Sequence, residues 1–174
     1  MDRKGFTLIE LVMVLVLVSI IAVVVVLRLP NVTSTKAGAF VDKLRVDIRY
    51  AQNLAMTRNT RSRVRFNGNG TAPPSGYAVV TSTTSTCTSF IAATDPAVGS
   101  ALTVSLGTGD YANISIVPSM NCLEYDSLGR PYNCTTAPAP AACSTTLNGM
   151  TITVQANAAT VGTLTVSSQT GAVN

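Results

Sequence analysis

The hydrophobic residues of this 174-residue chain are concentrated near its N-terminus. Residues 6–27 contain one charged side chain, Glu10, and Thr7 and Ser19 are the only other clearly polar residues in the run. A helix of this length would span roughly 33 Å, which is enough to cross a bilayer core of about 30 Å. The pattern therefore predicts a hydrophobic transmembrane helix at residues 6–29.

A helical period continues after this run, over residues 30–58. Apolar residues recur every three or four positions, at Phe40, Leu44, Ile48, Ala51 and Ala55. This period predicts an amphipathic helix from about Ser34 to Arg58, with its apolar stripe packed on a sheet. The stripe could instead be an interaction surface, and Pro30 either kinks the helix or begins its exposed part.

The period changes from helical to alternating just after this segment. Val64 and Phe66 alternate with Arg63 and Arg65, which predicts a strand with one buried face and one polar face. Gly, Pro, Asn and Asp separate further strands, expected at residues 77–81, 101–106, 114–117, 150–155 and 164–167. Residues 59–174 are therefore expected to form a β-rich globular domain. The predicted fold class is α+β, with one long N-terminal helix packed on an antiparallel β-sheet.

Composition argues against an enzyme. The chain has no His, which counts against an imidazole base and against a His metal ligand. Nucleophile-elbow and phosphate-loop motifs are missing, and the neighbouring acids Glu124 and Asp126 are interpreted as carboxylates on a solvated strand. Asp95, Asp110 and Asp126 do not have the spacing of a calcium loop, and a calcium site built from separated loops is the alternative. The sequence therefore predicts no catalytic residue, no metal and no cofactor.

Four cysteines lie beyond the apolar run, and their even number points to disulfides in an exported domain. They are Cys87, Cys122, Cys134 and Cys143, and no pair has the CxxC spacing of a zinc or redox site. Three pairings are open to four cysteines. We favour Cys134 with Cys143 and Cys87 with Cys122, and free buried thiols are the alternative.

Residues 4–10, with the sequence KGFTLIE, resemble the prepilin processing motif of type IV pilins and type II secretion pseudopilins. The resemblance implies a type IV pilin-like fold and a leader peptide, residues 1–5, that stays in the cytoplasm. A membrane prepilin peptidase would cut after Gly5 and methylate Phe6, which becomes the new N-terminus. Glu10 then becomes the fifth residue of the mature chain, where this family has its glutamate.

Elementary physical chemistry agrees with this processing. Gly5 places no side chain in a narrow protease site. Arg3 and Lys4 favour the cytoplasmic side of the membrane, so the globular domain is expected outside the cytoplasm. In a filament, Glu10 of one subunit can meet the Phe6 amine of a neighbour and set the axial register. The alternative is that Glu10 snorkels to the membrane surface.

Three further segments resemble the GspH/FimT group of pseudopilins and minor pilins. They are the helix-to-strand junction at residues 49–66 and two strands followed by glycine, at residues 123–131 and 164–173. The resemblance implies a structural minor pilin of a type IV pilus, held in the bacterial inner membrane with its domain on the periplasmic side before assembly. Its partners would be other pilins, the prepilin peptidase and an inner-membrane assembly platform. A type II secretion pseudopilin is the alternative.

A second alternative is a DNA-binding minor pilin that takes part in DNA uptake. Four arginines near the helix-to-strand junction could contact phosphates: Arg58, Arg61, Arg63 and Arg65. Only Phe66 supplies an aromatic side chain among them, and its place on the apolar face predicts that it is buried. A solvated strand face, or contacts with neighbouring subunits, is therefore the favoured interpretation.

Overall fold

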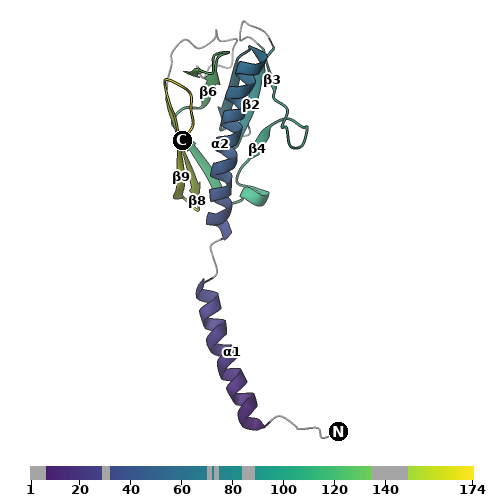
Figure 1. Ribbon diagram of the computed structural model, residues 1–174, viewed down its shortest axis with the longest axis vertical. Helices are drawn as coiled ribbons and strands as arrows, with labels where there is room; N and C mark the ends of the chain where they lie inside the picture. Colours follow the sequence, from purple (N-terminus) through teal and green to yellow (C-terminus); the bar gives the residue numbers. More distant parts are fainter. Residues whose placement is uncertain (1–6, 29–31, 70–71, 73–74, 84–88, 135–148) are drawn as a thin grey trace. The chain divides into compact units, whose positions relative to one another are not determined.

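The computed structural model describes residues 7–28, 32–69, 72, 75–83, 89–134 and 149–174 (Figure 1). The chain forms two compact units, Met1–Val32 and Thr33–Asn174. Two helices come first in the chain, and the strands that follow pair in antiparallel fashion. The α+β prediction is therefore confirmed. Pro30, where a kink or the start of the exposed half of the helix was expected, lies outside the described residues.

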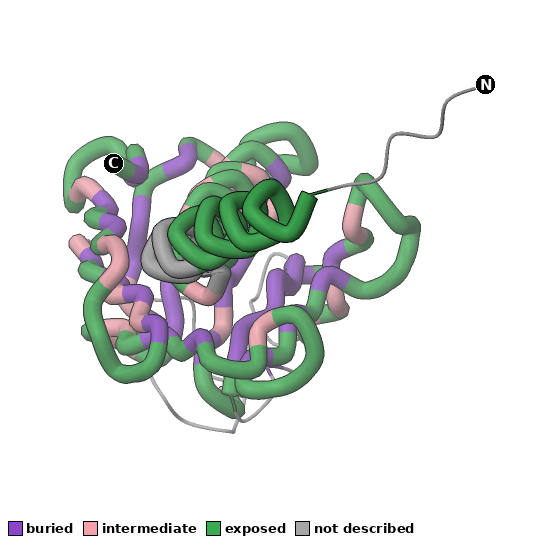
Figure 2. The backbone as a smooth tube through the Cα atoms, turned by 90° about the horizontal axis from the view of Figure 1, so that it is seen from below, coloured by how far each residue is buried: buried purple, intermediate pink, exposed green. Residues whose placement is uncertain are grey.

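The first unit contains helix α1, Leu8–Arg28. Residues 8–22, whose side chains are described, are all exposed (Figure 2). The large apolar side chains among them range from 44% exposed at Val12 to 82% exposed at Leu8. Among the helices of the described residues, none is both long enough and apolar enough to cross a membrane.

Helix α2, Val32–Arg58, carries the apolar stripe predicted from the sequence. All five predicted stripe residues are at most 1% exposed. The helix ends at Arg58, as expected, because Asn59 takes a left-handed conformation with φ of 49°. The Thr60 N–H then donates to the Ala55 carbonyl oxygen at 3.1 Å, which closes the last turn as a Schellman motif.

The larger sheet has six strands in the order β3-β2-β1-β6-β7, and β4 also pairs with β2. These strands are β1 (Ser62–Phe66), β2 (Gly76–Ser82), β3 (Phe90–Ala92), β4 (Thr103–Ser105), β6 (Cys122–Tyr125) and β7 (Pro131–Asn133). Strand β1 lies at the centre, with Arg63 opposite Val80 of β2 and opposite Glu124 of β6. This register places an arginine and a glutamate side by side on one face of the sheet.

The smaller sheet has three strands in the order β5-β8-β9. They are β5 (Ile114–Pro118), β8 (Met150–Ala156) and β9 (Ala159–Val166), and a short 3-10 helix, η1 (Gly109–Tyr111), precedes β5. The backbone of Asn174 pairs with that of Thr165 in β9 through two hydrogen bonds of 3.0 Å. The end of the described chain is thus tied to this sheet.

Helix α2 and both sheets share one hydrophobic core, and Figure 1 shows α2 lying along the sheets. Phe40 of α2 meets Tyr77 of β2 with ring centroids 6.2 Å apart, and Phe66 of β1 meets the same ring at 6.3 Å. From the smaller sheet, Ile152 and Leu164 are fully buried in this core. The stripe of α2 is therefore a core surface, as predicted.

The core also buries one polar contact between α2 and β2. The Tyr77 hydroxyl donates to Asp47 Oδ2 at 2.5 Å, and Lys43 Nζ lies 2.9 Å from the same oxygen. Burial, followed by the charge of Asp47, raises the pKa of Tyr77 above its ordinary value. Asp47 is only 7% exposed. Its carboxylate helps to fix the position of α2 against the sheet.

Candidate functional site

The processing motif is described only from Thr7 onward, so Gly5 and Phe6 lie outside the described residues. Thr7 is the N-cap of α1. Its carbonyl oxygen accepts the N–H groups of Glu10 at 3.1 Å and Leu11 at 3.2 Å, and its Oγ1 lies 3.4 Å from the Glu10 nitrogen. Thr7 and Glu10 therefore have the spacing of a capping box, a role that the sequence interpretation had missed.

Glu10 lies in the first turn of α1 and is exposed. The N-terminal end of a helix carries partial positive charge, so a carboxylate is favoured there. Its neighbours Ile9 and Leu11 are 67% and 54% exposed. Within the described residues, no Lys or Arg lies within ion-pair distance of the Glu10 carboxylate. The carboxylate is thus presented on an apolar surface beside a helix start.

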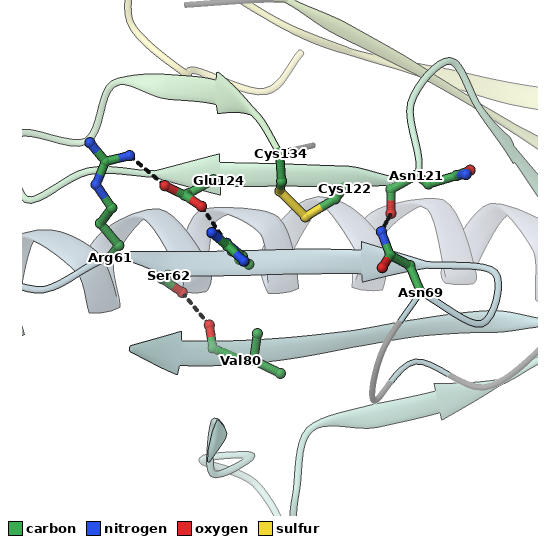
Figure 3. Close-up of a disulfide and its surroundings, with 9 residues drawn as sticks. Arg61, Ser62, Asn69, Val80, Asn121, Cys122, Glu124 and Cys134 are labelled. Atoms are coloured by element: carbon green, nitrogen blue, oxygen red, sulfur yellow. Dashed lines mark hydrogen bonds and ion pairs between the residues drawn. A yellow bond between two sulfur atoms is a disulfide. The ribbon is translucent and has the colours of Figure 1, made fainter. Parts of the chain in front are cut away.

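Two of the arginines expected on a solvated strand face, Arg61 and Arg63, are engaged by a buried glutamate of the second unit. Arg61 Nη1 donates to one carboxylate oxygen of Glu124 (Figure 3). Arg63 Nε donates to the other. Glu124 is 0% exposed and Arg63 is 8% exposed. The prediction of a solvated face is therefore wrong at both residues. Alternation along β1 correctly placed Arg63 on the face opposite to that of Val64, but it does not report whether that face is covered.

Two aromatic rings, those of Phe90 and Tyr132, lie against the arginine cluster, which consists of Arg61, Arg63, Arg65 and Glu124. The Arg63 guanidinium lies 3.9 Å from the centroid of the Phe90 ring, and that of Arg65 lies 5.4 Å from it. Burial, and then repulsion from Arg63, lower the pKa of Arg65 from its ordinary value. The expectation that only Phe66 lies near the arginines missed Phe90, which is separated from them in sequence and brought back by β3.

Arg58 lies apart from this cluster, exposed in the last turn of α2. Phe66 is fully buried, as predicted. The four arginines considered for DNA contact are thus divided: Arg58 is exposed, and Arg61 and Arg63 are engaged by Glu124.

The disulfide of the described chain joins Cys122 to Cys134, with Cα atoms 5.4 Å apart (Figure 3). The favoured pairings of Cys134 with Cys143 and of Cys87 with Cys122 are therefore wrong. Strands β6 and β7 form a hairpin in which Leu123 lies opposite Asn133, so the next residues outward, the two cysteines, meet across it. Cys87 and Cys143 lie outside the described residues.

The turn of this hairpin is organised by Asp126. Its Oδ1 accepts the N–H groups of Leu128 and Arg130, both at 2.9 Å. Its Oδ2 accepts from Arg130 Nε at 2.8 Å and from the Tyr132 hydroxyl at 3.0 Å. Burial alone raises the pKa of Asp126, but these hydrogen bonds outweigh it and hold the pKa below its ordinary value. Asp126 is thus a structural carboxylate.

A cavity of about 300 Å³ lies beside this turn and the end of α2. Its lining consists of Asn59, Thr60, Arg61, Asp126, Ser127, Leu128 and Arg130. The one carboxylate in the lining already accepts four hydrogen bonds, and no His or Cys lines the cavity. Within the described residues, no three His, Cys, Asp or Glu side chains cluster as metal ligands would.

The two strand-then-glycine segments, residues 123–131 and 164–173, meet under α2. Gln52 Nε2 donates to the Gly129 carbonyl oxygen and to the Thr170 carbonyl oxygen, both at 2.9 Å. The Tyr125 hydroxyl donates to the Gly171 carbonyl oxygen at 3.1 Å. One amide of α2 thus joins the β6–β7 turn to the turn that follows β9.

The chain is similar to solved structures over most of its length and to a family model at its N-terminus. Two solved structures of the type IV minor pilin FimU from Pseudomonas aeruginosa strain PAO1 are similar to the chain. The first has 14% identity and a TM-score of 0.48, and the match covers 83% of this chain and 91% of that one. The second has 14% identity and a TM-score of 0.44, with 80% and 89% covered. No curated protein is significantly similar in sequence.

The N-terminal motif is matched directly. The family model described as the prokaryotic N-terminal methylation motif covers residues 1–26. The finer assignment to the GspH/FimT group stays a prediction. Residues 1–26 therefore carry the prokaryotic N-terminal methylation motif, in agreement with the prepilin processing motif that residues 4–10 resemble.

Proposed function

We propose that this protein is a structural subunit of a type IV pilus, present in the filament as a minor pilin. The observation that carries the proposal is the methylation motif over residues 1–26, which includes most of the exposed apolar helix that begins at Leu8. The divided arginines and the satisfied Asp126 turn support a structural role over a catalytic one.

The first step is processing of the prepilin. A prepilin peptidase cuts after Gly5 and methylates the amine of Phe6. Thr7 caps α1, so the helix begins two residues after the new N-terminus. Cleavage therefore places a positive amine one residue before the cap, and the chain gains a charge at the helix end that it did not have before.

The second step is assembly through α1. In the membrane, its apolar side chains face lipid, and in the filament the same side chains face those of neighbouring subunits. Glu10 is an exception, since a carboxylate on an apolar surface is costly unless it is paired. Pairing of Glu10 with the Phe6 amine of a neighbour neutralises both charges in a site of low dielectric. Such a pair forms in one axial register only, so it would guide each new subunit into place.

Location and partners follow from this cycle. Before assembly the chain is held by residues 6–29 in the bacterial inner membrane, with residues 59–174 on the periplasmic side. Its partners there are the prepilin peptidase and an inner-membrane assembly platform, and in the filament they are other pilins. The net charge of Arg3 and Lys4 supports a cytoplasmic N-terminus.

A type II secretion pseudopilin is the second candidate, because the same motif and helix serve that class equally well. We do not propose DNA uptake, since Arg61 and Arg63 would have to leave Glu124 in order to bind phosphates.

The test is quantitative mass spectrometry of surface filaments sheared from the native organism. A small, reproducible amount of the mature peptide relative to the most abundant pilin is expected for a minor pilin. A dominant amount would make this chain the main subunit. Absence from filaments, with the processed chain still in the membrane, would move the assignment to a secretion pseudopilin.

A matched pair of variants tests the role of Glu10. The Glu10→Gln chain should be cut at the same bond but should be depleted from filaments. The Asp42→Asn chain loses a carboxylate from an exposed position of α2 and should enter filaments normally. Equal filament contents for the two variants would contradict the role given to Glu10.

A further inference from the structure

The β6–β7 hairpin is short and is closed at both ends. Asp126 closes the turn, and the Cys122–Cys134 disulfide closes the open end (Figure 3). Between these closures β7 has only three residues, and the first of them, Pro131, has no N–H to donate. The backbone ladder between β6 and β7 is therefore small, and the attachment of β7 depends on the two closures.

Strand β7 covers the buried ion pairs from the side. Tyr132 lies opposite Glu124 in the β6–β7 register. Its ring centroid lies 4.8 Å from the Arg61 guanidinium, which itself donates to Glu124. All four residues of β6 are buried. Release of β7 would open the backbone edge of β6 and bring water to the Glu124 ion pairs, and exposed strand edges are templates for wrong pairing.

We propose that the Cys122–Cys134 pair is a redox latch on β7, which an extracytoplasmic thiol oxidoreductase closes after export. This inference rests on the proposed function only for the compartment of the domain, because cytoplasmic thiols are kept reduced. Closing the latch docks β7 beside Glu124, and reduction releases β7 while α2 and the β5-β8-β9 sheet stay folded. The latch thereby ties completion of the larger sheet to arrival outside the cytoplasm.

The chemistry is thiol–disulfide exchange. A thiolate of one cysteine attacks the disulfide of the oxidoreductase, and the second cysteine then resolves the mixed disulfide. The two cysteines lose two protons and two electrons and form one sulfur–sulfur bond. The disulfide of the oxidoreductase gains both protons and both electrons and becomes a dithiol.

The latch holds once it has closed. Cys122 is 2% exposed and Cys134 is 4% exposed, so an attacking thiol must first open β7 locally. Exchange requires access to the sulfur as well as a thiolate. The finished subunit therefore keeps the bond in an oxidising compartment.

The test is hydrogen exchange on the full chain in detergent, before and after reduction by a dithiol and alkylation. The Cys87→Ser/Cys143→Ser chain is used, because only the described pair is then left to reduce. Amides of residues 131–133 and 122–125 should exchange at least about tenfold faster after reduction, while those of residues 150–166 should not change. Equal acceleration in all these segments, or no acceleration in any of them, would overturn the latch.

A second measurement covers a failure of that variant to fold and also tests the partner. The unsubstituted chain can be reduced and compared in the same way, with residues 150–166 as the internal reference. In cells without an extracytoplasmic thiol oxidoreductase, maleimide should label Cys122 and Cys134. Labelling as low as in normal cells would contradict the role of the oxidoreductase in forming this disulfide. These readouts need neither prepilin cleavage nor filaments, so their failure is distinguishable from failure of the proposed function.

Discussion

The backbones of Gly171 and Gly129 pack directly against each other. A Cβ built on Gly171 would lie 2.7 Å from the Gly129 carbonyl oxygen and 2.7 Å from Cε1 of Tyr125. The same carbonyl oxygen accepts a hydrogen from Gln52 of α2 at 2.9 Å. This contact explains why a strand followed by glycine occurs twice in the sequence: the two turns share one joint, and a side chain at Gly171 would separate them.

Gly171→Ala should therefore destabilise the folded chain by about 2 kcal/mol or more, from left-handed backbone strain plus steric overlap. Gly107→Ala is the matched control, because Gly107 has φ of 76° and Gly171 has φ of 69°, but nothing lies within 4 Å of a Cβ at Gly107. The free energies of unfolding are compared by urea denaturation. If both variants lose the same unfolding free energy, the contact between Gly171 and Gly129 does not contribute to stability.

Glu124→Gln should destabilise strongly, because Arg61 and Arg63 would then share a buried site without a counter-charge. Breaking a buried ion pair from one side costs about 3–5 kcal/mol. Asp42→Asn breaks the Arg45 pair, whose aspartate side chain is 74% exposed, and should cost less than about 1 kcal/mol. Urea denaturation followed by circular dichroism gives both values, and similar losses would contradict the importance of burial.

Stability should fall at acid pH, partly through Asp126. Its hydrogen bonds hold the folded pKa below the value of about 3.9 expected for an unfolded aspartate. The carboxylate therefore stabilises the folded chain above about pH 3.9, and this contribution is lost as the pH falls through the folded pKa. The unfolding free energy of Asp126→Asn should decline less steeply below about pH 4 than that of the unsubstituted chain. Asp95→Asn is the control, and an unchanged slope for Asp126→Asn would refute the assignment.

Ala158→Gly should stabilise the chain. Asn157 and Ala158 form the two-residue loop between β8 and β9 with φ of 50° and 64°, as in a type I′ turn. Left-handed backbone costs alanine about 1–2 kcal/mol and glycine loses roughly 0.5–1 kcal/mol of chain entropy, so a gain of about 0.5–1 kcal/mol is expected. Ala159→Gly, one residue later in β9, should destabilise. The melting temperatures of the two variants should move in opposite directions.

Periodicity was enough to predict the long elements of this fold. The stripe from Phe40 to Ala55 predicted α2 and its buried face, and the alternation at Val64 and Phe66 predicted β1. Strands β3 and β7 have three residues each, which is too short for any period to be visible. These two segments are strands because they pair with β2 and β6, and not because of a pattern in their own sequences.

The features of the site that were not predicted also depend on contacts between segments that are distant in sequence. Burial of Glu124 and Arg63 depends on which segments cover the outer face of β1 and β6, and Phe90 reaches that face from β3. The Cys122–Cys134 bond depends on a hairpin whose second strand was not predicted. The Asp-Ser-Leu-Gly-Arg run at residues 126–130 was a usable turn signal for that hairpin. Glu10, by contrast, was singled out from sequence because a carboxylate in an apolar run is costly, and its role stays a prediction.

The most direct test of the prepilin assignment is the mass of the N-terminal peptide of the mature chain, purified from membranes of the native organism. A peptide that begins at Phe6 and carries one methyl group on its amine is predicted. A mature chain that still begins with residues 1–5, or that is cut at another bond, would contradict the assignment.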